Sequence, residues 1–76
     1  MKIKILGTGC PNCIRLEENT KKALEETGKK GEISKITEIQ DIMRYGIMST
    51  PAIVIDEEVK SYGKVNSVED IKKMIE

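Results

Sequence analysis

Aromatic residues are scarce in this chain. Its 76 residues include no tryptophan, no phenylalanine and only two tyrosines, which is too few to build a surface for stacking nucleic-acid bases. An excess of either charge is also missing, because 13 lysine and arginine residues balance 13 aspartate and glutamate residues and the two signs are interleaved. The composition therefore predicts neither a nucleic-acid partner nor attachment to an anionic membrane surface.

Long hydrophobic runs are missing as well. The longest, at residues 52–55, falls far short of the roughly 18 residues that a membrane span needs. Residues 1–7 alternate lysine with isoleucine, so they lack the continuous apolar core of a secretory signal. A chain of this length buries only about 60% of its unfolded surface. We therefore expect one domain over residues 1–76, a monomer in the cytoplasm with no membrane contact and no cofactor.

The first half of the chain alternates between strand and helix patterns. Residues 2–6 alternate with a period of two and predict a strand, and residues 32–36 predict a second. Between them, small and apolar residues recur at helical spacing over residues 11–27. Pro11 suits the first position of that helix and Gly28 the position just past its end. The charged residues expected on its solvent face are Glu17, Glu18, Lys21, Lys22, Glu25 and Glu26.

A short helix is predicted next, over about residues 38–45. The pattern T-x-x-Q from Thr37 to Gln40 matches a capping box, in which the two side chains satisfy each other's backbone donors. Gly46 suits the end of the helix. The residues expected to face inward are Ile39, Ile42 and Met43.

The last third of the chain predicts a hairpin and a helix. The apolar run at residues 52–55 is typical of a strand covered on both faces, and a tight turn leads from it to a strand at residues 59–63. Ser67 can then cap a helix that ends near Ile75. The order βαβαββα predicts an α/β fold, with a four-stranded mixed sheet and helices on both of its faces.

The two cysteines, Cys10 and Cys13, lie three residues apart, between the first predicted strand and its helix. A bridge across so short a loop would restrain little of the unfolded chain, so a purely structural disulfide is a weak explanation. At the start of a helix, unpaired backbone N–H groups lower the pKa of a thiol. We therefore expect Cys10 to attack a disulfide and Cys13 to resolve the mixed disulfide, while Pro11 keeps the first turn rigid.

With these motifs in place, the chain resembles the thioredoxin superfamily, and most closely its small, glutaredoxin-sized redox-active disulfide proteins. The resemblance covers nearly the whole chain and rests on Cys10-Pro11-Asn12-Cys13, Thr50-Pro51 and Gly63. It implies a thiol–disulfide oxidoreductase that reduces disulfide-containing protein substrates and is itself reduced by an upstream disulfide reductase. It also implies that Pro51 is cis, that the backbone of Thr50 pairs with an extended substrate segment, and that Gly63 faces the substrate.

Three positions depart from the family pattern. Gly9 stands where thioredoxins have tryptophan, and Asn12 stands where glutaredoxins usually have tyrosine. Lys4, six residues before Cys10, stands where thioredoxins keep a buried acid. If Lys4 lies under the two thiols, its charge would stabilise a thiolate; the alternative is a lysine that extends out of a thinly covered sheet face.

Other interpretations also remain open. Two thiolates after a glycine-rich loop resemble heavy-metal-associated domains, so a carrier of copper or zinc is the main alternative. A non-catalytic adaptor that uses the fold only for protein contacts is another. Tyr45, Ile47 and Met48, which precede Thr50, could form an apolar lip beside Cys10, although Ile47 also suits the core and Met48 suits a surface that accepts varied partners.

Overall fold

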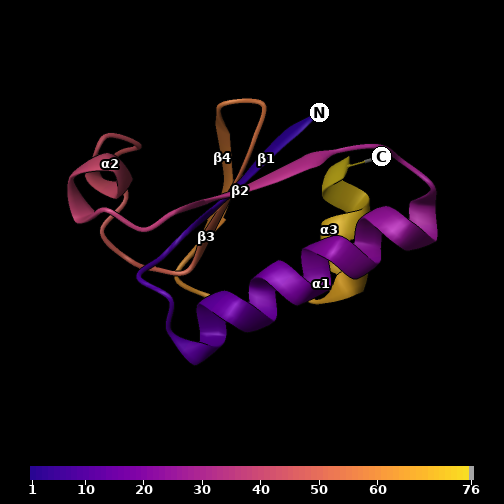
Figure 1. The fold of residues 1–76 in the computed structure, drawn as a ribbon, viewed down its shortest axis with the longest axis horizontal. Coiled ribbons are helices and arrows are strands. Elements are labelled where there is room, and N and C mark those ends of the chain that lie inside the picture. The colour runs from indigo at the N-terminus through magenta and orange to yellow at the C-terminus, as the bar shows by residue number, and fades with distance from the viewer. Residues whose placement is uncertain (76) are drawn as a thin grey trace.

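The computed structural model describes residues 1–75 and contains four strands and three helices in the predicted order (Figure 1). The strands are β1 (Lys2–Leu6), β2 (Glu32–Ile36), β3 (Ala52–Ile55) and β4 (Glu58–Tyr62). The helices are α1 (Pro11–Thr27), α2 (Ile39–Met43) and α3 (Val68–Ile75). Within residues 1–75, no helix is both long enough and apolar enough to cross a membrane.

The four strands form one mixed sheet in the order β2-β1-β3-β4. Strand β1 pairs in parallel with β2 and antiparallel with β3, and β3 pairs antiparallel with β4. This confirms the predicted α/β architecture. Because Leu6 lies opposite Ala52, the loop that leaves β1 and the loop that enters β3 meet at the same end of the sheet.

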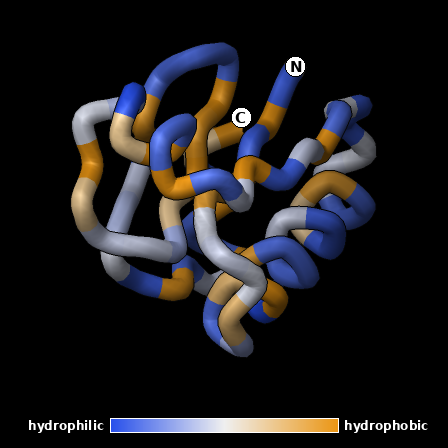
Figure 2. The backbone as a smooth tube through the Cα atoms, turned by 60° about the vertical axis from the view of Figure 1, so that its left-hand side comes forward, coloured by the Kyte–Doolittle hydropathy of each residue, from blue (hydrophilic) through white to orange (hydrophobic). Residues whose placement is uncertain are grey.

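The two faces of the sheet carry separate hydrophobic cores. On one face, α1 and α3 lie side by side against the sheet (Figure 1). The backbone coloured by hydropathy shows lysine and isoleucine alternating along β1, next to the N-terminus (Figure 2). The buried residues of this first core are Ile3, Ile5, Leu16, Ala23, Ile53, Ile55, Ile71 and Ile75. The second core lies on the face of α2 and consists of Leu6, Ile42, Ile47, Ala52 and Val54.

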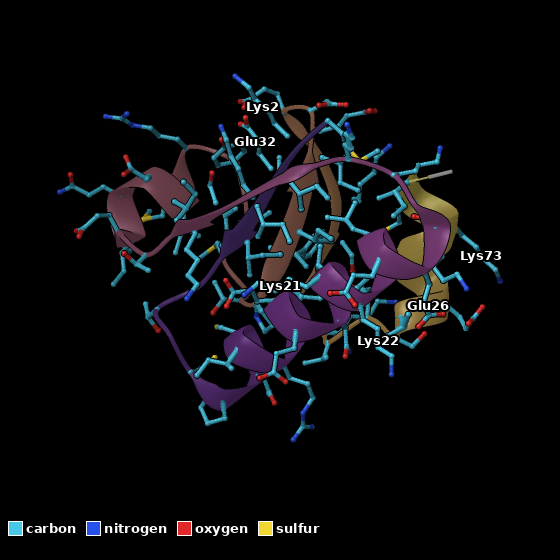
Figure 3. All side chains as sticks on the ribbon, turned by 45° about the vertical axis from the view of Figure 1, so that its right-hand side comes forward. Lys2, Lys21, Lys22, Glu26, Glu32 and Lys73 are labelled. Carbon is cyan, nitrogen blue, oxygen red and sulfur yellow. The ribbon has the colours of Figure 1, made fainter. Side chains whose placement is uncertain are left out.

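Most of the predicted helix ends agree with the structure. Pro11 is the first residue of α1, and Gly28 ends that helix in the left-handed conformation, with φ of 68°. The Ser67 hydroxyl accepts a hydrogen bond from the Asp70 N–H at 3.1 Å, so it caps α3 as expected. Lys22 and Glu26 of α1 and Lys73 of α3 lie on the outer side of this helical layer (Figure 3).

Helix α2 differs from its prediction. It is only five residues long, and its N-cap is Glu38, without a side-chain hydrogen bond. The capping box predicted from Thr37 and Gln40 is therefore wrong. Ile42 is buried, but Ile39 is 63% exposed and Met43 is 60% exposed, so two of the three residues expected to face inward do not. A single turn of helix offers the sheet only one side chain to bury, and Ile42 takes that place.

The outer strands of the sheet carry charge. Strand β2 pairs only with β1, and β4 pairs only with β3. The exposed residues of these two strands include Glu32 and Lys35 in β2 and Glu58 and Lys60 in β4. Glu32 lies next to Lys2 of the neighbouring strand at the rim of the molecule (Figure 3). The two central strands, by contrast, supply most of the buried side chains of the sheet.

Candidate functional site

Cys10 is the N-cap residue of α1, with extended backbone angles of φ −67° and ψ 164°. Its Sγ accepts a hydrogen bond from the Cys13 N–H at 3.3 Å, and its carbonyl accepts one from the Ile14 N–H at 3.1 Å. Pro11 follows it at the first helical position. The sulfur of Cys10 therefore takes the place that a capping serine or aspartate oxygen usually occupies.

The two thiols have pKa values shifted in opposite directions. The pKa of Cys10 lies below its ordinary value, chiefly because of the neighbouring Cys13 thiol, and further because of the backbone N–H groups of Cys13 and Asn12. Burial raises the pKa of Cys13, whose side chain is enclosed while Cys10 is only partly covered. The accessible sulfur is therefore the one that ionises more readily, which is the arrangement that nucleophilic attack requires.

Gly7 lies directly against the buried thiol. A Cβ atom at residue 7 would stand 2.2 Å from the Cys13 Sγ and 3.9 Å from the Pro51 Cα, so only glycine allows this close approach. Local sequence patterns gave Gly7 no role beyond its place in the glycine-rich loop before the cysteines. The contact could not be read from local patterns, because it joins three separate segments of the chain.

The loop before β3 lies beside the cysteines. The Thr50–Pro51 peptide bond is cis, as the family resemblance implies, and Pro51 is buried whereas Thr50 is exposed. The Gly63 N–H donates a hydrogen bond to the Pro51 carbonyl at 2.9 Å. Within residues 1–75, the backbone of Thr50 makes no hydrogen bond to another backbone group.

An apolar groove of about 280 Å³ opens next to this loop. It runs from Thr8 and Thr50 toward α2, and its floor is formed by the buried Ile42 and Ile47. Its remaining walls are Ile39, Met43 and Met48, and Met48 is 95% exposed. Of the three residues expected to form a lip, Ile47 and Met48 therefore line the groove. Ile47 is also part of the second core.

Tyr45, the third of those residues, packs against the second core and lies with Lys4 away from the thiols. The ammonium group of Lys4 donates a hydrogen bond to the Tyr45 hydroxyl at 2.8 Å and forms an ion pair with Glu57. Glu57 belongs to the β3–β4 turn, at the opposite end of the sheet from Gly7 and Pro51. These contacts match a lysine that extends out of a thinly covered face, and they raise the pKa of Lys4.

Glu17 is not on the solvent face of α1, where the sequence placed it. Its side chain is only 13% exposed, and its Oε1 lies 3.2 Å from the Lys35 Nζ of β2. Together with Cys13, both residues line a small cavity beside the buried thiol. The one available signal was spacing, since Glu17 follows Cys13 by four residues and therefore shares its side of the helix.

Comparison with known proteins fits this geometry. The thioredoxin domain family model matches residues 1–76. The chain is also 44% identical to a thioredoxin of Methanothermobacter thermautotrophicus over 75 residues, which is 99% of this chain and 97% of that protein. The chain belongs to the thioredoxin family. A second thioredoxin, from Methanocaldococcus jannaschii, is 44% identical over 71 residues, or 93% of this chain and 81% of the relative.

Membership of the thioredoxin family makes this protein a thiol–disulfide oxidoreductase. The family match also confirms the resemblance drawn from the sequence. Cys10 and Cys13 are the only cysteines of the chain, and both are thiols in the structure. Any dithiol chemistry within one copy of the protein must therefore use this pair.

Proposed function

We propose that the protein reduces disulfide bonds of other proteins, with Cys10 as the attacking residue and Cys13 as the resolving residue. The observation that carries the proposal is the geometry at the start of α1, where the partly covered Cys10 Sγ accepts the Cys13 N–H at 3.3 Å while the Cys13 thiol is buried. The opposite shifts of the two thiol pKa values agree with this geometry. The Cys10 thiolate attacks a substrate disulfide and forms a mixed disulfide, and one substrate thiolate leaves and takes a proton from water. Cys13 then attacks Cys10 Sγ, so that the second substrate thiol is released and the pair is oxidised.

The substrate segment is proposed to bind along the loop before β3. The exposed Thr50 offers its backbone to an extended chain, which would add to the sheet in the manner of an extra strand. Pro51 and Gly63 hold that loop through their hydrogen bond, and Gly63 packs closely on Ser49. Apolar side chains next to the substrate cysteine would enter the groove beside Met48.

The partners that follow from this proposal are disulfide-containing proteins and an upstream disulfide reductase. Such a reductase would return the oxidised pair of cysteines to the dithiol state. Copper or zinc transport by the same two thiolates is the alternative drawn from the sequence. Membership of the thioredoxin family favours the redox role, and within residues 1–75 no third cysteine, histidine or carboxylate joins the pair to form a metal-binding cluster.

The test is to replace Cys13 and look for captured substrates. In a Cys13→Ser variant, Cys10 can still attack but nothing resolves the mixed disulfide, so substrate proteins should remain covalently attached and be released by dithiothreitol. A Cys10→Ser variant is the matched control and should capture none. Equal capture by the two variants, or no reduction of insulin disulfides by the unaltered protein, would contradict the proposal.

The pH dependence of alkylation provides a second measurement. Because the pKa of Cys10 is lowered, the rate of its reaction with iodoacetamide should reach half-maximum at a lower pH than that of a free cysteine, about 8.5. In Cys13→Ser the midpoint should rise but stay below the free value, because the backbone N–H groups remain. A midpoint at the free value in the unaltered protein would show that the helix start does not activate Cys10.

A further inference from the structure

A small cavity adjoins the buried Cys13 thiol, on the side away from the substrate groove. Its volume is about 30 Å³, which is enough space for a water molecule. Ile5 and Ile14 contribute apolar walls, whereas Glu17 and Lys35 contribute the charged side chains. The resolving thiol residue, a glutamate and a lysine therefore line the same small, partly open cavity.

The position of Glu17 is unusual for a glutamate on a helix of this kind. Its side chain is only 13% exposed, and partial burial of a charge is costly unless the charge is paired. The pairing comes from Lys35, whose ammonium lies 3.2 Å away but whose side chain is 60% exposed. Lys35 thus gives the Glu17 carboxylate a charged partner next to the cavity, while the Lys35 side chain itself remains open to solvent.

Cys13 needs a proton acceptor in order to react. Only a thiolate attacks a disulfide, and burial keeps the Cys13 thiol protonated by raising its pKa. Lys4, at the position where thioredoxins keep a buried acid, forms its contacts at the other end of the sheet. The titratable groups that line the cavity are Cys13 and Glu17 from α1 and Lys35 from β2; β1 contributes only Ile5, and the loops contribute Gly7, Gly9 and Thr37.

We propose that Glu17 accepts the Cys13 proton through a water molecule in this cavity, and that Lys35 positions the Glu17 carboxylate. The proposal deepens the function proposed above and rests on it. In the resolving step, the Cys13 Sγ–H bond breaks and its proton passes by way of the water to the Glu17 carboxylate. The Cys13 sulfur forms a bond to Cys10 Sγ, the bond between Cys10 and the substrate sulfur breaks, and the substrate thiolate leaves. Glu17 then returns its proton to solvent or to the departing thiolate.

The experiment isolates the resolving step with 5,5′-dithiobis(2-nitrobenzoate), which releases a coloured thiolate twice. One equivalent reacts first with Cys10, and the second release reports the attack of Cys13 on the mixed disulfide. In Glu17→Gln we expect the second phase to slow about tenfold at pH 7, which is a modest effect for the loss of a proton acceptor. The first phase should keep its rate. The difference should disappear at a pH high enough to ionise Cys13 without help.

The sign of the effect separates this role from simple electrostatics. If Glu17 acted only through its charge, its removal would ease the ionisation of Cys13 and speed the second phase. Lys35→Gln should slow that phase less than Glu17→Gln does, because the carboxylate would remain but lose its partner. Glu18→Gln is the matched control, since Glu18 neighbours Glu17 and is exposed, and it should leave both phases unchanged.

The outcomes distinguish a failure of this inference from a failure of the proposed function. If Glu17→Gln leaves the second phase unchanged, speeds it, or slows it equally at every pH while the unaltered protein reduces insulin disulfides, then the role of Glu17 is wrong and the proposed function stands. If the unaltered protein gives no second phase at all, the proposed function fails, and the role of Glu17 fails with it.

Discussion

The two faces of the sheet differ in how completely helices cover them, and the buried thiol and the apolar groove lie on different faces. Helices α1 and α3 cover one face, whose core contains eight buried residues from the helices and the strands together, and Cys13 of α1 is buried as well. Over the other face, the part of the chain that the structure describes has the five-residue α2, and the core there contains five buried residues, one of which is Ile42 of α2. Its uncovered apolar side chains line the groove next to Thr50. The well-covered face thus holds the resolving thiol of the proposed mechanism, and the thinly covered face holds the groove proposed for the substrate.

The largest expected effect is on the fully covered face. Leu16 is completely buried in the first core, so Leu16→Ala should lower the free energy of unfolding by about 2–5 kcal/mol. Ile39→Ala, on the thin face, should change it by less than about 0.5 kcal/mol, because Ile39 is already exposed. Urea denaturation of both variants measures the contrast. Similar losses in the two variants would show that the two faces do not differ as described.

The thin face should matter for substrate binding instead. In a Met43→Ser/Met48→Ser double variant, two exposed side chains of the groove lose their apolar surface. We expect the KM for a protein disulfide to rise about fivefold, as partial burial of two methionines would predict. The reaction with a small disulfide reagent, which does not reach the groove, should keep its rate. An unchanged KM for the protein substrate would show that the groove is not used.

The smallest effect is expected at the far end of the thin face, where Lys4 contacts Glu57. This pair lowers the pKa of Glu57, so its stabilisation is present above the ordinary carboxylate pKa and is lost as the pH falls through the lowered value. Glu57→Gln should therefore lower Tm slightly at pH 7 and not at all in strong acid. In a Lys4→Met background the same substitution should have a much smaller pH-dependent effect, because only the weaker influences of Tyr45 and Lys2 on the Glu57 pKa remain. An undiminished effect would show that Lys4 is not the main partner of Glu57.

Local patterns predicted the elements of this fold well, because each signal concerns only neighbouring residues. Alternation marks a strand, and Pro11, Gly28 and Ser67 mark where a helix begins or ends. The wrong predictions concern residues whose burial depends on a segment that is distant in the sequence. Helical spacing assigned Ile39 to the core, but it could not show that nothing covers that side of α2. In the same way, the pattern of charges along α1 assigned Glu17 to solvent. It could not show that Glu17 forms an ion pair with Lys35 of β2.

The residues of the candidate site also divide into those that a local motif predicts and those that only the packing of distant segments brings together. Cys10, Cys13 and Pro11 form one continuous motif, and the family resemblance adds Thr50, Pro51 and Gly63. No pattern in the sequence predicts the cavity beside Cys13 or the close contact between Gly7 and Cys13. Both depend on how β1, β2 and α1 pack together, which follows from the whole chain rather than from any one segment of it.

The charged rims of the sheet also bear on self-association. An uncovered strand edge invites pairing with another molecule, and lysine or glutamate along it discourages such growth. Both outermost strands carry these residues. If the edge strands of two copies paired with each other, their hydrated charged side chains would be brought together and would lose water. Charged residues on both rims should therefore discourage growth of the sheet by edge-to-edge pairing, so that in the proposed function a foreign strand adds at Thr50 rather than at β2 or β4.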